Sequence, residues 1–185
     1  MIEKWKIIST EDASPSSWLP VLKQKVILPN NTIVDDYYVA TFGNVVMVLP
    51  ITKDNKIILV KQYKHGVGEI LIELPAGSQH DQLSIKESAL EELEEETGIK
   101  TTLSNLISLG VISNNPTKTN HITYGFIANN ISFNSKQTLD ITEDIEIMKI
   151  PSRDVIKMIL SGEIWVGDSV SFIMKAYLMF PQIFK

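Results

Sequence analysis

Several residue types that often build reactive sites are absent or rare in this chain of 185 residues. There is no cysteine, which excludes disulfides and thiolate metal ligands. The three histidines, His65, His80 and His121, are scattered and lack the spacing of a zinc site, so each is interpreted as a loop or surface residue. Arg153 is the only arginine, so a bound anion must be held by metal, lysine or backbone N–H groups.

Long hydrophobic runs and an excess of basic residues are also missing. No apolar run approaches the length of a membrane span, and the N-terminus lacks the apolar core of a signal peptide. The net charge of −5 argues against a general nucleic-acid binder, which needs a basic face to displace phosphate counterions. We therefore expect a cytoplasmic protein with neither membrane nor nucleic-acid partners.

Short runs rich in β-branched residues recur along the chain and outnumber the helical patterns. Strands are predicted within residues 23–41, with a turn at 29–31, and at 44–51, 56–63, 69–77, 106–112, 121–128 and 145–150. Helices are predicted from Ser84 to Gly98, from Ser152 to Gly162 and over 169–180. This pattern predicts an α+β class in which helices flank a mixed sheet.

The most unusual stretch reads GSQHDQLSIKESALEELEEETGI, residues 77–99, and carries five glutamates within positions 91–96. Ser84 followed by Glu87 has the form of a capping box, which predicts the start of a helix. Gly98 suits the left-handed position that ends one. Like charges one turn apart repel by roughly 0.2–0.5 kcal/mol per pair, and a helix C-terminus favours cations. So much negative charge at this helix end needs an explanation.

Helical geometry places two of these glutamates next to the apolar side of the helix. At about 100° per residue, Glu92 and Glu96 fall beside Ile85 and Ala89, so both carboxylates are expected to face the protein body. A divalent cation would remove their repulsion, and oxygen ligands suit Mg²⁺ or Mn²⁺. The alternative is a solvated acidic face, and the helical pattern by itself leaves both open.

The segment ELPAG…EELEEETGI resembles the Nudix box, G-x5-E-x7-R-E-U-x-E-E-x-G-U, in which U is apolar. Aligned on its first glycine, the chain keeps seven of the nine specified positions, namely Gly77, Glu92, Leu93, Glu95, Glu96, Gly98 and Ile99. The preceding Glu-Leu-Pro-Ala and the upstream LVKQYK are similar to those of ADP-ribose and other nucleotide-sugar pyrophosphatases. This resemblance to a Nudix hydrolase subfamily extends over about residues 40–170.

The resemblance implies a Nudix fold, in which a mixed β-sheet is sandwiched between helices, with an N-terminal β-strand extension. It divides the chain into an extension at residues 1–42 and a Nudix hydrolase domain at residues 43–185. The extension is expected to mediate formation of a homodimer.

The resemblance also implies a metal site and two catalytic carboxylates. Glu92, Glu95 and Glu96 would bind Mg²⁺ or Mn²⁺, with Glu95 acting directly or through water. The backbone carbonyl of Ala76 would be a further ligand. Glu143, in the stretch TEDI, would be the general base, and Glu95 is the second catalytic candidate. The alternative for Glu143 is an ordinary polar turn.

Five further residues are expected to contact the substrate. Lys61, Lys64 and Lys118 are candidates for binding phosphate as point charges. Glu73 is interpreted as a pocket residue, and the alternative is a strand end that faces solvent. Trp5 is expected to stack on adenine across a dimer, and the alternative is ordinary packing.

The box is degenerate at two positions, where its first glutamate is Leu83 and its arginine is Glu91. In the family these two residues commonly pair and brace the loop against the helix. Losing one partner would leave a buried charge at a cost of roughly 3–5 kcal/mol, whereas losing both leaves no orphan and allows Leu83 to pack. We interpret the change as a tolerated replacement, and the alternative is decay of the site.

The resemblance predicts metal-dependent hydrolysis of the diphosphate linkage of a nucleoside diphosphate sugar. ADP-ribose or an ADP-sugar is the preferred substrate, and the products would be a nucleoside monophosphate and a sugar phosphate. Two alternatives stay open. One is a Nudix hydrolase of other nucleotides, and the other is a Nudix-fold binding or regulatory module without turnover.

Overall fold

The computed structural model describes residues 1–185 and contains two compact units. The first comprises Met1–Gly43 with Ser113–Ile122, and the second comprises Asn44–Ile112 with Thr123–Lys185. The N-terminal residues are thus joined in one unit by a segment from later in the chain. None of the helices is both long and apolar enough to cross a membrane.

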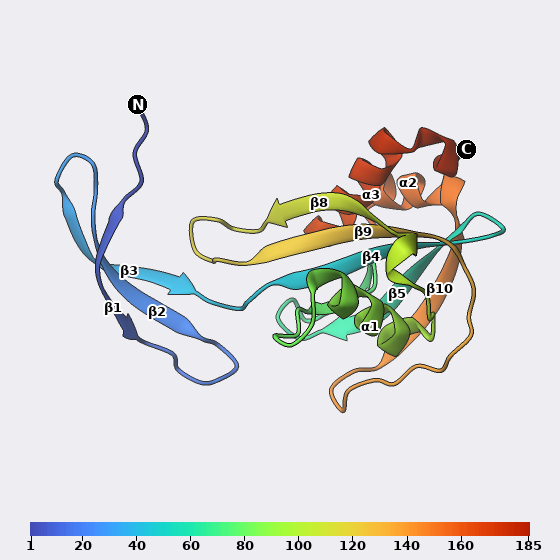
Figure 1. The fold of residues 1–185 in the computed structure, drawn as a ribbon, viewed down its shortest axis with the longest axis horizontal. Coiled ribbons are helices and arrows are strands. Elements are labelled where there is room, and N and C mark those ends of the chain that lie inside the picture. The colour runs from blue at the N-terminus through green and yellow to red at the C-terminus, as the bar shows by residue number, and fades with distance from the viewer. The chain divides into compact units, whose positions relative to one another are not determined.

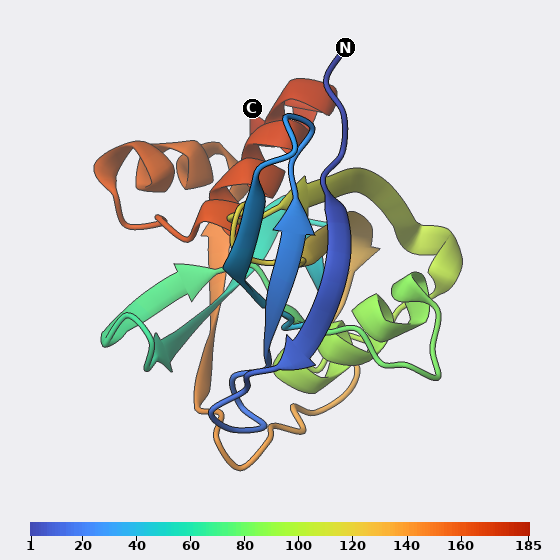
Figure 2. The ribbon, with the colours of Figure 1, turned by 90° about the vertical axis from the view of Figure 1, so that its left-hand side faces the viewer.

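The N-terminal unit is built on a three-stranded antiparallel sheet (Figure 2). Its strands, in the order β1-β2-β3, are β1 (Lys6–Asp12), β2 (Val21–Ile27) and β3 (Ile33–Ala40). Asn31, in the predicted turn between β2 and β3, has a positive φ of 65°. The sequence does not predict β1, because all of its residues are exposed and no alternation of buried and exposed positions marks it.

The second unit carries the remaining strands and the three α-helices (Figure 1). Its strands are β4 (Val45–Thr52), β5 (Lys56–Lys64), β6 (Glu69–Glu73), β7 (Ala76–Ser78), β8 (Leu106–Ser113), β9 (Ile122–Ile131) and β10 (Ile145–Pro151). Its helices are α1 (Ile85–Thr97), α2 (Ser152–Ser161) and α3 (Gly167–Met179), with short 3₁₀ helices at Leu103–Asn105 and Pro181–Phe184. The predicted segments are confirmed, except that residues 69–77 form two strands, separated at Leu74 and Pro75.

The strands of the second unit form one mixed sheet. β10, β5, β4, β9 and β8 are neighbours in that order, while β6 pairs with β5 and β7 pairs with β4. β4 runs parallel to β9 and antiparallel to β5, and β10 is antiparallel to β5. The predicted α+β class with a mixed sheet is therefore confirmed.

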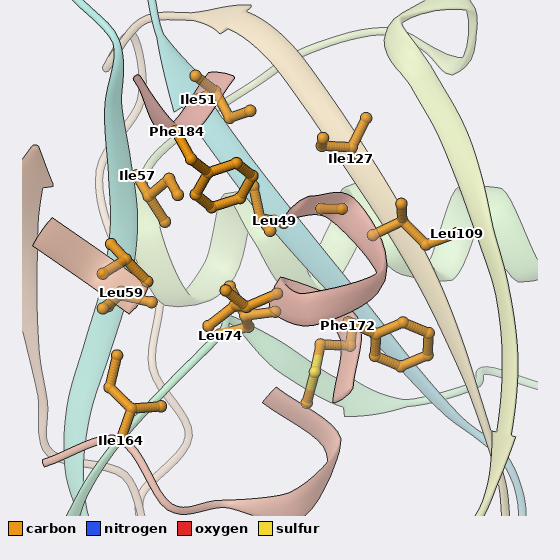
Figure 3. Close-up of a cluster of buried hydrophobic side chains, with 14 residues drawn as sticks. Leu49, Ile51, Ile57, Leu59, Leu74, Leu109, Ile127, Ile164, Phe172 and Phe184 are labelled. Carbon is orange, nitrogen blue, oxygen red and sulfur yellow. The ribbon is translucent and has the colours of Figure 1, made fainter. Parts of the chain in front are cut away.

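Both faces of this sheet are covered by helices, as Figure 1 shows. Met47, Leu49 and Ile51 of β4 point into a core shared with α2 and α3, part of which is drawn in Figure 3. Val46 and Val48 point to the opposite face, into a core shared with α1. Successive residues of a strand point to opposite faces, so a strand buried on both sides reads as one continuous apolar run. The sandwich predicted from the family resemblance is confirmed.

The sheet opens between its two central strands. β4 and β5 pair only at Ile51 and Ile57, beyond which β5 pairs with β6 and β4 pairs with β7. The link between β6 and β7 therefore crosses from one central strand to the other, and the Val48 amide donates a hydrogen bond to the carbonyl of Pro75 at 3.0 Å. The segment that links β6 to β7 therefore lies between the two central strands, next to β4.

Truncation of Phe172 should show how much the α3 side of the sandwich contributes. Phe172 is fully buried, and its ring lies against Gly125 so closely that an added Cβ there would come within 2.1 Å of it. We expect Phe172→Ala to lower the free energy of unfolding by about 3–5 kcal/mol in urea denaturation. Leu178→Ala on the same helix is the control, because Leu178 is exposed and should cost less than about 0.5 kcal/mol. Equal costs for the two variants would contradict this description of the core.

Candidate functional site

Helix α1 begins and ends at the residues that its sequence predicts. The Ser84 hydroxyl accepts a hydrogen bond from the Glu87 amide at 3.3 Å, and the Glu87 carboxylate accepts one from the Ser84 amide at 2.8 Å. Gly98 is left-handed, with φ of 68°, and its amide donates to the Glu94 carbonyl. The capping box and the glycine stop set the two ends of α1. Burial of Ala89 and Leu93 then determines which side of the helix faces the protein, and so the direction of each glutamate.

The predicted inward orientation of two glutamates is confirmed. Glu96 is 2% exposed, and the side chain of Glu92 is 13% exposed. They lie on the helix face that also buries Ala89 and Leu93 completely. Glu94, by contrast, forms an ion pair with Lys100 at 3.2 Å near the surface. A fully solvated acidic face is therefore excluded for Glu92 and Glu96.

Glu96 is fixed by the start of β7. The Ala76 amide donates a hydrogen bond to Glu96 Oε2 at 2.8 Å, and Gln62 Nε2 lies 3.5 Å from Oε1. Burial raises the pKa of Glu96 to about 8, although the Ala76 hydrogen bond and the charge of Lys64 act in the opposite direction. The carboxylate is thus held in place but lacks enough positive charge to favour its ionised form.

Glu92 lies against the glycine that opens the box. A Cβ added to Gly77 would come within 2.0 Å of Glu92 Oε2, so a larger residue here would displace the carboxylate from this position. Burial and then the charge of Glu95 raise the pKa of Glu92 to about 7. Burial, followed by the charge of Glu91, also raises the pKa of Glu95. The three box glutamates therefore share one environment that disfavours negative charge.

Glu143 lies within electrostatic reach of this cluster. Its charge contributes to the raised pKa values of Glu92 and Glu95. Its carboxylate accepts a hydrogen bond from the Asp140 amide at 3.1 Å, and its amide donates to the Asp140 carbonyl at 3.0 Å. Glu143 therefore lies in a polar turn and is also close enough to the box glutamates to affect their pKa values. Its role as general base stays a prediction.

The loop that carries Glu143 is fastened to the C-terminal end of α1. Gln137 Nε2 donates to the carbonyls of Glu96 at 2.8 Å and Ile145 at 3.2 Å. The Thr138 amide donates to the Glu95 carbonyl at 2.9 Å. These donors satisfy carbonyls that the end of a helix leaves free. Sequence reasoning missed Gln137, because no local pattern links it to a helix that ends forty residues earlier.

The two predicted lysines of β5 have different surroundings. Lys64 forms an ion pair with Glu73 at 3.2 Å, and its charge acts on Glu96. Glu73 is buried, so the alternative in which it faces solvent is wrong. Lys61 instead pairs with Glu146 of β10 at 3.5 Å. Successive residues of a strand point to opposite faces, and these two lysines are three positions apart, so they lie on opposite faces of the sheet. This difference could have been predicted from the sequence.

Trp5 and Lys118 belong to the N-terminal unit and gather around Tyr37. The rings of Trp5 and Tyr37 meet edge to face with centroids 5.5 Å apart, and Lys118 Nζ lies 4.9 Å from the Tyr37 centroid. The Tyr37 hydroxyl donates to the carbonyl of Thr117. These contacts supply the ordinary packing given above as the alternative for Trp5, while its stacking on adenine and the phosphate role of Lys118 stay predictions.

The prediction that His80 is a loop or surface residue is confirmed, because it lies exposed in the loop before α1. Its contacts were not predicted: Nδ1 lies 3.0 Å from Glu91 Oε2, and Nε2 lies 3.6 Å from Glu92 Oε1. The Glu91 side chain is 40% exposed, so its charge does not require a partner and gave no signal for this contact.

The donor chemistry of this cluster fits a hard divalent cation. Carboxylates and a backbone carbonyl are the ligands that Mg²⁺ and Mn²⁺ prefer, and buried carboxylates with raised pKa values gain most from a nearby positive charge. No three acidic or histidine side chains converge closely enough to enclose an ion as they stand. Coordination would therefore require small rotations of the glutamate side chains toward a common point.

Two family models match consecutive parts of the chain. One, described as NUDIX domain, matches residues 41–157 and so includes α1 and the loop that carries Glu143. The other, described as nucleoside diphosphate sugar hydrolase N-terminal domain, matches residues 5–40 and so includes the three-stranded sheet.

Individual relatives cover most of the chain. An ADP-ribose pyrophosphatase of Bacillus subtilis (strain 168) is 30% identical over 161 residues, which are 86% of this chain and 85% of the relative. A methanol dehydrogenase activator of Bacillus methanolicus is 28% identical over 182 residues, 97% of this chain and 95% of the relative. A solved structure described as "Crystal structure of ADP compounds hydrolase" has the same fold, with a TM-score of 0.86 at 20% identity, covering 98% and 97% of the two chains.

In the metal-free protein, Glu96→Gln should make unfolding less dependent on pH. Folding holds the pKa of Glu96 at about 8 instead of 4.5, so the wild type loses stability as pH rises between these values, because the carboxyl ionises in the unfolded chain while it stays protonated in the folded protein. Glutamine carries no charge, so the variant should be more stable than the wild type near pH 8.5, by on the order of 2 kcal/mol. Urea denaturation with EDTA at acid and alkaline pH measures this. Two curves that fall equally with pH would refute the assignment.

Proposed function

The chain belongs to the NUDIX domain family, and from this premise we propose that it hydrolyses the diphosphate linkage of a nucleoside diphosphate sugar. ADP-ribose or an ADP-sugar is the preferred substrate, and the products are a nucleoside monophosphate and a sugar phosphate. The match of residues 5–40 to the N-terminal domain of nucleoside diphosphate sugar hydrolases supports this substrate class. The relative named ADP-ribose pyrophosphatase supports the choice of ADP-ribose.

The observation that carries this proposal is the buried pair Glu92 and Glu96 one helical turn apart. Both face inward from the box helix, and both have pKa values raised by burial. Two such carboxylates destabilise the protein unless a cation offsets their charge. A cation bound at these carboxylates would also offset the negative charge of a diphosphate, so the site is suited to a substrate with two adjacent phosphates.

The cation is Mg²⁺ or Mn²⁺, held by Glu92, Glu95, Glu96 and the Ala76 carbonyl. When bound, it neutralises diphosphate oxygens and makes the attacking water more acidic. The amide of Ala76 keeps Glu96 in place from the other side. Glycine at position 77 leaves the space that the Glu92 carboxylate occupies.

The remaining steps fall to side chains around this site. Glu143 takes a proton from water as the water oxygen forms a bond to one phosphorus, and the bond from that phosphorus to the bridging oxygen breaks. Its carboxylate must then exchange the Asp140 amide for the water. Lys64, beside Glu73, offsets charge on the phosphates. Trp5 stacks on the adenine, and Glu73 shapes the pocket.

Turnover of ADP-ribose tests the proposal. With Mg²⁺, coupled phosphatase and phosphate detection, the wild type should release phosphate from the products, and Glu96→Gln should lose at least about 100-fold in kcat. Glu94→Gln is the matched control, because Glu94 lies on the same helix but pairs with Lys100 at the surface. It should stay within about threefold of the wild type. Equal loss in both variants would contradict the role of Glu96.

The same assay separates the alternatives. Tight ADP-ribose binding in calorimetry without turnover would support a binding module, the alternative that Leu83 and Glu91 favour. Turnover of nucleoside triphosphates or dinucleoside polyphosphates in preference to ADP-sugars would support a different NUDIX hydrolase. ADP-ribose turnover that depends on Glu96 supports the proposal.

We propose further that the chain forms a homodimer in the cytoplasm through its N-terminal strands. Apolar side chains are exposed on β1 and β3, among them Ile7, Ile8, Ile33 and Tyr38. Such a concentration of exposed apolar residues is typical of interaction surfaces. Size-exclusion chromatography with light scattering should give twice the chain mass of 20.8 kDa. A species of single chain mass at micromolar concentration would argue against the dimer.

A further inference from the structure

The loop before α1 is joined to the helix by a pair of contacts that the box pattern does not contain. His80 Nδ1 lies 3.0 Å from Glu91 Oε2, and its Nε2 lies 3.6 Å from Glu92 Oε1. These are ion-pair distances, which become attractive charge–charge contacts when the imidazole is protonated. Glu91 Oε2 is shielded from solvent and accepts no hydrogen bond, so the imidazole 3.0 Å away is the cationic group that pairs with it, although both side chains are partly exposed.

The loop also contributes its backbone to this junction. The His80 amide donates to the hydroxyl of Ser88 at 3.1 Å, and Ser88 is fully buried in α1. The Gln79 amide donates to the Asn44 carbonyl at 3.0 Å, just before β4. His80 is therefore the point at which the loop, the helix and the box glutamates meet.

The two hydrophobic cores do not include this loop. Leu83, which replaces the box glutamate, is only half-buried and belongs to neither hydrophobic core. A surface cavity of about 480 Å³ opens here, lined by His80, Asp81, Gln82, Leu83 and Glu91. The expectation that packing of Leu83 takes over the role of the missing pair stays a prediction. Polar contacts fasten the loop to Ser88 of α1 and to Asn44.

Glu92 is confined on two sides by the same loop. Gly77 touches its carboxylate on one side, and the imidazole of His80 lies on the other. The other nitrogen of that imidazole lies 3.0 Å from Glu91, the neighbour of Glu92 on the helix. The position of His80 thus limits the directions in which the Glu92 side chain can turn.

We propose that His80 is a positioning residue that replaces the glutamate–arginine pair of the box and orients Glu92 toward the diphosphate-bound cation. The brace is reversed relative to the box, because the loop supplies the donor and the helix supplies the carboxylate. This inference rests on the proposed function for its catalytic consequence, while the brace itself is independent of the substrate.

Kinetics of His80→Ala test the positioning role. With ADP-ribose as substrate, kcat should fall by about tenfold to a hundredfold, and the Mg²⁺ concentration for half-maximal rate should rise several-fold. A merely structural role would lower the active fraction without changing the Mg²⁺ dependence. His65→Ala is the matched control, because His65 lies in the β5–β6 hairpin beside Tyr63, and it should behave as the wild type.

A rescue variant tests the replacement itself. In the His80→Ala background, Leu83→Glu with Glu91→Arg rebuilds the pair that the box specifies, with its usual polarity. This triple variant should recover kcat and Mg²⁺ dependence to within about threefold of the wild type. Loss in His80→Ala that the rebuilt pair fails to recover would overturn the replacement, and an unchanged Mg²⁺ dependence in His80→Ala would overturn the positioning role.

Hydrogen exchange separates this inference from the proposed function. In metal-free, nucleotide-free protein, the amides of residues 79–84 should exchange at least about threefold faster in His80→Ala, and the triple variant should restore protection. Unchanged exchange would overturn the brace, whatever the protein hydrolyses. Absence of turnover in the wild type, with faster exchange in His80→Ala, would refute the proposed function and leave the brace standing.

Discussion

The hydrogen bond from the Ala76 amide to Glu96 is the contact on which the site depends. It joins β7, a part of the sheet, to α1, which covers one face of that sheet. Because Glu96 is almost inaccessible to solvent, its carboxylate has few partners other than this amide and Gln62. The bond also fixes the start of the loop at Gly77, which lies against Glu92. Strand, loop and helix are thereby positioned together.

Local signals were sufficient to predict the helix of the site. Ser84, Glu87 and Gly98 act within one or two turns of the chain, so their contacts follow from sequence spacing alone. The inward direction of Glu92 and Glu96 follows from the same spacing, because the rotation of a helix is regular. The doubly covered sheet was predictable as well, since β4 and β5 read as continuous apolar runs.

Contacts between distant segments were not predictable in this way. Gln137 reaches the carbonyls of Glu96 and Ile145, and only the path of the chain brings these groups together. His80 is close to α1 in sequence, but which carboxylates its ring meets depends on how the loop turns before Ser84. β1 lacks any pattern because none of its side chains is buried. In each case the missing information is tertiary and not a matter of local propensity.

The separation of β4 and β5 beyond Ile51 and Ile57 has a consequence for how such a site can diversify. The opening arises from strand pairing, so backbone hydrogen bonds define it and the side chains at its edge do not. Partly exposed side chains next to this opening, such as Lys64 of β5, can then be exchanged without disrupting the backbone pairing. A scaffold of this kind can acquire new substrates through changes at its rim, while the amide of Ala76 keeps the buried acid group where chemistry requires it.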